Sequence, residues 1–208
     1  VKETDKPWVA KRTEIFANSP EILDQSTTRL KALDGIAAKN PEIFGLMKEQ
    51  GLLTALAATA QKGINMQLGP YQGAIGADVN TFLQKVKLNT NQQELVADVA
   101  RILGTEFLAN VKTNKGLLGI NPTDNDARLL AAPMASLEDT ARSVQRWSRE
   151  QILYNKQRGA LYNQLEAHDE RAGATAPPRN FFISKDYKKT IDDYGKLREQ
   201  LYNQFYPR

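Results

Sequence analysis

The chain has no cysteine and only one histidine among its 208 residues. The lack of cysteine excludes disulfides, thiol catalysis and every metal site built on cysteine ligands. One histidine is fewer than the two or three that zinc enzymes usually need, and a Ser-His-Asp triad would need it to be well placed. No nucleophile–base pair and no pair of carboxylates placed for acid–base catalysis is apparent. We therefore expect a protein that is not an enzyme and that uses no cofactor and no metal.

Long apolar runs and strand patterns are also lacking. The longest nearly apolar run, residues 51–60, is about half of the ~20 residues that a membrane-spanning helix needs. No stretch alternates β-branched and polar residues as a strand would. Hydrophobic residues make up 41% and charged residues 25%, with a net charge of +4, which suits a globular chain. Helical spacing recurs throughout and predicts an all-α fold, a bundle of about eight helices.

Helix starts are the clearest local signals. Residues 19–21 (Ser-Pro-Glu) and 40–42 (Asn-Pro-Glu) place a capping residue, a proline suited to the first helical position and an acid that complements the helix dipole. Thr90 with Gln93 predicts a capping box before a strongly amphipathic helix. Ser184 predicts the cap of a final helix over about 185–205.

Glycine marks the expected ends and irregularities. Gly51 should end a helix in the left-handed conformation, and Asp34-Gly35 marks a possible break. Residues 63–76 contain four glycines and a proline, so we predict an irregular loop there, with a helix resuming by Ala77. Gly104 lies inside an amphipathic helix, where it predicts a close helix crossing.

A long helix is predicted over about 137–171, because this stretch has no proline and one glycine. A seven-residue repeat of two columns fits it, and the seam that the columns form together is apolar at both ends and polar in the middle. The columns are Leu137, Val144, Gln151, Arg158, Leu165 and Thr140, Trp147, Tyr154, Leu161, His168. The polar middle argues against a simple coiled coil. After a Pro-Pro turn, the last helix should return antiparallel and form a helical hairpin with the long one.

The predicted organisation has five consecutive segments. They are an N-terminal arm (1–18), a bundle of short helices (19–118), a turn plus the long helix (119–171), a Pro/Gly linker (172–180) and the C-terminal helix (181–208).

The best candidate for a functional surface is a basic run on the long helix. It comprises Arg142, Arg146, Arg149, Lys156 and Arg158, with Trp147 and Tyr154 as nearby aromatic residues. Five basic residues and one acid give residues 141–158 a net charge of +4. The run suits contact with a partner or with phosphates. The alternative is a solvated face that pairs with acids at the ends of the same helix, which is how most charge runs behave.

Three other clusters have weaker claims to chemistry. The acids around His168 (Glu166, Asp169 and Glu170) would suit a divalent ion, but a solvated helix end explains them more simply. Asp124 and Asp126 resemble the start of a calcium loop whose later ligands are missing, so they are better explained as helix-start acids. Gly69, Gly73 and Gly76 lack the Gly-Lys-Ser/Thr element of a phosphate loop, which favours a plain inter-helix loop.

Residues 119–130 read Gly-Ile-Asn-Pro-Thr-Asp-Asn-Asp-Ala-Arg-Leu-Leu. This segment resembles internal virion and DNA-ejection proteins of tailed, mainly short-tailed, bacteriophages. In those proteins a Gly-x-x-Pro-Thr-Asp-x-Asp turn opens a short helix. A loop similar to residues 132–137 and a long helix rich in Arg, Lys and Tyr then follow. The resemblance covers about residues 88–166, is strongest over 116–140, and includes no catalytic residues.

The resemblance implies a non-enzymatic virion structural protein, an oligomeric component of the internal core or of the genome-ejection apparatus. Such a protein would lie inside the capsid or at the portal vertex and could reach the host envelope after ejection. Its expected partners are copies of itself and portal or core proteins, with DNA phosphates and a membrane as further contacts. The alternative is a basic helical nucleic-acid-binding protein, and a third hypothesis is a periplasmic or membrane-surface helical module.

Overall fold

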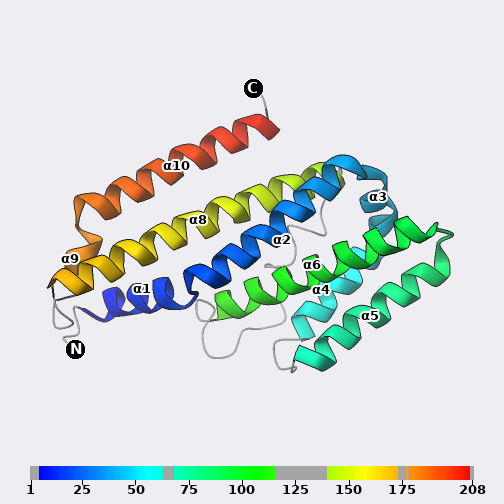
Figure 1. Cartoon of the computed structure of the whole chain (residues 1–208), viewed down its shortest axis with the longest axis horizontal. Coiled ribbons are helices and arrows are strands. Elements are labelled where there is room, and N and C mark those ends of the chain that lie inside the picture. Colours follow the sequence, from blue (N-terminus) through cyan, green and yellow to red (C-terminus); the bar gives the residue numbers. More distant parts are fainter. Residues whose placement is uncertain (1–4, 63–67, 116–139, 173–176, 178, 207–208) are drawn as a thin grey trace. The chain divides into compact units, whose positions relative to one another are not determined.

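The computed structural model describes residues 5–62, 68–115, 140–172, 177 and 179–206. This part of the chain is helical and contains no strand, so the predicted all-α fold is confirmed (Figure 1). The helices are α1 (Lys6–Phe16), α2 (Pro20–Lys39), α3 (Pro41–Glu49), α4 (Leu52–Lys62), α5 (Leu68–Lys85), α6 (Thr90–Lys115), α8 (Thr140–Ala172), α9 (Arg179–Phe182) and α10 (Lys185–Phe205). Helix α8 confirms the long helix. The phage-like segment over 119–130, with Asp124 and Asp126, lies outside the described residues.

Two of the predicted serine caps are in place. The Oγ of Ser19 accepts a hydrogen bond from the N–H of Ile22 at 3.4 Å before α2, and the Oγ of Ser184 accepts one from the N–H of Tyr187 at 3.2 Å before α10. Within segment 5–62, by contrast, Asn40 makes no side-chain hydrogen bond to α3. Proline and glutamate in the first turn are therefore the start signals that α3 retains.

The capping box of α6 lies one residue earlier than predicted. The Oδ1 of Asn89 accepts from the N–H of Gln92 at 2.9 Å, and the Oε1 of Gln92 accepts from the N–H of Asn89 at 3.1 Å. The prediction of Thr90 with Gln93 is therefore wrong in register. Asparagine ranks above threonine as an N-cap, which explains why the helix begins where it does.

The predicted breaks inside helices are largely absent from the described segments. Helix α2 continues through Asp34 and Gly35 without interruption, and α5 begins at Leu68 instead of near Ala77. A proline is tolerated in the first helical turn, where its missing N–H has no partner to lose. Gly51, as predicted, has a positive φ of 76° and separates α3 from α4.

The chain forms two compact units that are not consecutive in sequence. Unit 1 comprises Val1–Lys31 and Ser148–Arg208, and unit 2 comprises Ala32–Trp147. The boundaries fall inside α2 and α8, so the predicted segments 19–118 and 119–171 are each divided between the units. The predicted N-terminal arm, 1–18, contains α1 and belongs to unit 1. Local signals define helices, but long-range packing decides which helices share a core.

Unit 2 packs α3, α4, α5 and α6 around a core of large apolar side chains that includes Phe44, Leu56 and Leu103. Gly104 of α6 lies against α5, because a Cβ there would overlap Cδ1 of Ile75 and lie 3.2 Å from its Cγ1. The hydroxyl of the buried Tyr71 donates to the carbonyl oxygen of Gly104 at the same place. Gly104 thus permits the close helix crossing that the sequence predicted.

Unit 1 has an aromatic core formed by residues from α1, α8, α9 and α10. Phe181 and Phe182 of α9 are buried, and their rings lie 5.4 Å and 5.2 Å from that of Tyr187 on α10. The ring of Trp8 on α1 stacks on Phe182 at 5.5 Å. Helix α9 has only four residues, too few to be stable in isolation, so these ring contacts hold it in place.

Candidate functional site on helix α8

All seven residues of the predicted basic surface lie on α8, but they do not share one solvated face. Arg142 and Lys156 are exposed; Arg146, Arg149, Trp147 and Tyr154 are partly buried; Arg158 is buried. Three of them (Arg142, Arg146 and Trp147) belong to unit 2, and the other four belong to unit 1. Trp147 packs against the apolar core of unit 2. The helical spacing predicted the shared element correctly but not the burial.

Arg158 departs most from the prediction, because its side chain is directed into unit 1. It is only 6% exposed, and its Nη2 donates to the main-chain oxygen of Glu14 on α1 at 2.6 Å. Its guanidinium also lies over the ring of Tyr154, with 5.4 Å between the guanidinium carbon and the ring centroid. The residue links α8 to α1 and is not part of an exposed basic face.

A buried polar residue of α8 that lies outside the two repeat columns has its partners elsewhere in unit 1. Asn155 is 8% exposed, and its amide nitrogen donates to the Oγ of Ser26 at 2.9 Å and to the Oγ1 of Thr27 at 3.4 Å. Both partners lie on α2. A buried amide without partners would cost about 1–3 kcal/mol, so these contacts explain how Asn155 can be buried. Asn155 is in neither column of the repeat, so the sequence pattern indicated neither its burial nor its partners.

Two contacts fix the direction of α10 along α8. Gln164 donates to the Oγ1 of Thr190 at 2.8 Å, and the guanidinium of Arg149 lies 5.6 Å from the ring centroid of Phe205. The two contacts are fifteen positions apart on each helix, from 149 to 164 on α8 and from 190 to 205 on α10. Residue 149 contacts 205 and residue 164 contacts 190, so the two helices run in opposite directions. The two helices are therefore antiparallel over about 22 Å, and the predicted hairpin is present.

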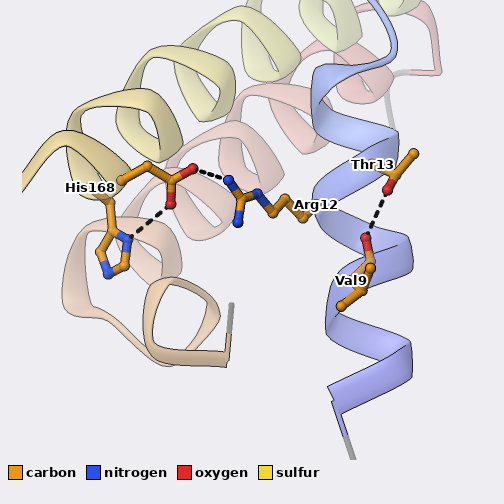
Figure 2. Close-up of polar contacts among 5 residues, drawn as sticks. Val9, Arg12, Thr13 and His168 are labelled. Atoms are coloured by element: carbon orange, nitrogen blue, oxygen red, sulfur yellow. Dashed lines mark hydrogen bonds and ion pairs between the residues drawn. The ribbon is translucent and has the colours of Figure 1, made fainter. Parts of the chain in front are cut away.

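The acidic end of α8 is joined to α1 by an ion pair. Nη2 of Arg12 lies 2.6 Å from Oδ2 of Asp169, and Nδ1 of His168 lies 3.6 Å from the other carboxylate oxygen (Figure 2). Arg12 and Asp169 remain 30% and 21% exposed, so the ion pair contributes at most about 1 kcal/mol. Among the described residues, no three His, Asp or Glu side chains are grouped so as to hold a metal ion.

Helix α10 carries large apolar side chains that unit 1 does not cover. Leu197 is 42% exposed, Tyr202 is 55% exposed and Tyr206 is 46% exposed, whereas Leu201 is buried. Leu197 and Tyr202 are five positions apart, so they lie on opposite sides of the buried strip. The rings of Tyr202 and Tyr206 pack together, with 4.8 Å between their centroids. We call Leu197, Tyr202 and Tyr206 the α10 flanks. Helical spacing assigns Leu197 to the apolar face of α10, but its exposure depends on which neighbours pack against that helix.

No family model, no curated protein and no solved structure matches this chain. Within the part of the chain that the structure describes, no helix has both the length and the apolar character needed to cross a bilayer.

Proposed function

We propose that this chain is a non-enzymatic structural protein of a phage virion, an oligomeric component of the internal core or of the genome-ejection apparatus near the portal. The sequence resemblance over residues 88–166 supports the phage context. The uncovered flanks of α10 support the mode of action, which is assembly through helical surfaces. The phage context and the assembly role are separable, and each has its own test.

The single observation that carries the assembly role is the exposure of Leu197 and Tyr202 on either side of a buried strip. Covering a large apolar side chain contributes about 1.5–3 kcal/mol, and tyrosine is enriched at protein interfaces. A helix with apolar side chains on both flanks is able to contact two neighbours while it stays packed on α8. Such a helix suits repeated subunit contacts.

The test is the mass of the purified chain, measured by light scattering alone and with the virion proteins encoded beside its gene. We expect the mass of an oligomer or of a complex for the wild type, and the mass of a monomer for the double variant Leu197→Ser/Tyr202→Ser. The matched control is Gln200→Ser/Asn203→Ser, which changes two exposed polar residues of the same helix. A chain that stays monomeric at all soluble concentrations, and that binds none of these proteins, would refute the assembly role.

The alternative of nucleic-acid binding now depends on fewer cations than the sequence suggested. Arg142 and Lys156 are the exposed members of the basic run. Two phosphate contacts give a slope of about −2 in a plot of log affinity against log salt concentration. DNA titration at two salt concentrations measures that slope. A slope of about −2 that falls to about −1 in Lys156→Gln would favour nucleic-acid binding over assembly.

A further inference from the structure

Unit 1 contains a cavity of about 160 Å³ where α1, α8, α9 and α10 meet. Its apolar wall consists of Ile15, Leu161, Phe182 and Ile191, one residue from each helix. A cavity of roughly 150 Å³ holds one benzene-sized molecule. The space therefore suits a small molecule with an apolar body of five or six carbon atoms, by the same comparison.

The polar wall of this cavity contains a buried cation without an anionic partner. Arg158 is 6% exposed, and its partners among the described residues are a main-chain oxygen, the hydroxyl of Tyr154 at 3.5 Å and the ring of Tyr154. None of these carries a negative charge. A buried charge that no opposite charge compensates is costly, and cavities of this kind attract a counter-ion.

Lys11 adds a second cation to the same wall. Its ammonium lies 5.1 Å from the ring centroid of Trp8 and, in the part of the chain that is described, has no carboxylate within 4 Å. Glu14 is the one acid that lines the cavity, and it forms no ion pair with a described residue. Two cations and one anion give the lining a net charge of +1; Arg158 is the buried charge among them, whereas Lys11 and Glu14 are exposed.

We propose that this cavity is a binding site for a small monocarboxylate with an apolar tail. The carboxylate accepts hydrogen bonds from the guanidinium of Arg158 and the ammonium of Lys11. The tail lies against Ile15, Leu161 and Ile191. This site is separate from the α10 flanks, and it does not depend on the assembly role.

The charges and the volume select this class of ligand. A monoanion neutralises the net charge of +1, whereas a dianion would leave the cavity negative beside Glu14. A primary amine would meet two cations. Burial, and secondarily the charge of Glu14, raise the pKa of Tyr187, so its hydroxyl stays protonated and able to donate to a carboxylate.

The experiment compares pentanoate with pentanamide, which has nearly the same shape but no charge, and with pentylamine. Binding to the full chain is measured by calorimetry and by ligand-observed NMR. We expect pentanoate to bind at least about tenfold more tightly than pentanamide, because a charge-assisted hydrogen bond is about twice as strong as a neutral one. Pentylamine should not bind.

Two substitutions are expected to act in opposite directions. Arg158→Gln should weaken pentanoate binding about tenfold or more, since it removes the buried cation. Glu14→Gln keeps the main-chain oxygen that holds Arg158 and removes the like charge, so it should tighten pentanoate binding about threefold or more. Neither substitution should change the affinity for pentanamide by a comparable factor. If Arg158→Gln does not fold, Lys11→Gln takes its place: it should weaken pentanoate binding, whereas Glu14→Gln should tighten it.

Three results would overturn the proposal. The first is no pentanoate binding to the full chain at any soluble concentration. The second is equal affinity for pentanoate and pentanamide, which would reduce the site to an apolar cavity. The third is Glu14→Gln weakening pentanoate binding, which would mean that the carboxylate does not lie near Arg158 and Lys11.

Discussion

Replacing Gly104 with alanine measures how closely α5 and α6 pack. The new Cβ would overlap Cδ1 of Ile75 and lie 3.2 Å from its Cγ1, whereas carbon atoms pack best at about 3.5–4.0 Å. Ile75 is 7% exposed, so it has little room to move. Overpacking of this kind costs about 1–3 kcal/mol, and the better helix propensity of alanine returns about 1 kcal/mol. Gly104→Ala should therefore lower the free energy of unfolding by up to about 2 kcal/mol.

The matched control is Gly76→Ala on α5, one residue after Ile75. A Cβ at Gly76 meets nothing within 4 Å, so this substitution should raise the free energy of unfolding by about 1 kcal/mol. Ile75→Val removes Cδ1, and Gly104→Ala should cost less in that background than in the wild type. Urea unfolding followed by far-UV circular dichroism gives the free energies of unfolding of the wild type, the three single variants and the double variant. If Gly104→Ala stabilises the protein as much as Gly76→Ala does, the close crossing is refuted.

Three further predictions concern other parts of the two units. In urea unfolding, Asn89→Ala should lower the free energy of unfolding by about 1 kcal/mol, whereas Thr90→Ala should be nearly neutral. A larger loss for Thr90→Ala than for Asn89→Ala would favour the capping box of Thr90 and Gln93 that the sequence predicted. Burial, and secondarily the charge of Asp78, raise the pKa of Tyr71 from 10.0 to about 12. The stability that this shift contributes is fully present below pH 10 and is lost as the pH rises through 12. Ultraviolet titration should therefore show Tyr71→Phe differing from wild type only towards pH 12, and a difference centred near pH 10 would contradict the burial of that hydroxyl. Asn155→Ala should cost about 1–3 kcal/mol, because it removes the amide that donates to the buried hydroxyl of Thr27, and a neutral effect would contradict that contact.

The sequence predicted those features that one residue type decides locally. Ser184 caps α10, Gly51 takes a positive φ and Gly104 lies at a close crossing, each for a reason that its own chemistry supplies. The prediction failed where two local signals competed, because both Asn89 and Thr90 are acceptable caps and the better one prevailed.

The prediction also failed where packing overrides local preference. Residues 68–76 contain Gly69 and Pro70, yet they are helical. Tyr71 and Ile75 are 1% and 7% exposed in the core of unit 2, and their burial outweighs the cost of the glycines, about 1 kcal/mol each. Burial of this kind depends on helices that are distant in the sequence, so the local pattern could not reveal it.

The candidate site was predicted least well, for the same reason. Helical spacing placed all the basic residues on α8, but whether each is solvated depends on what packs beside it. The partner of Arg158 is a main-chain oxygen of Glu14, 144 positions away. A main-chain acceptor leaves no trace in the residue types, so no pattern could have indicated it.

The packing of α8 in unit 1 decides which surfaces remain for self-assembly. A heptad helix with a polar centre often uses that centre to fix the register with a second chain. Here Arg158, which belongs to that centre, bonds to α1, while Asn155 and Gln164 on the same helix bond to α2 and α10, so these polar groups are matched within one chain. Pairing between copies through this seam would break those contacts, whereas pairing through Leu197 and Tyr202 leaves them intact. Asn155→Ala should therefore change the stability without changing the oligomer mass, and Leu197→Ser/Tyr202→Ser should change the mass with little effect on stability.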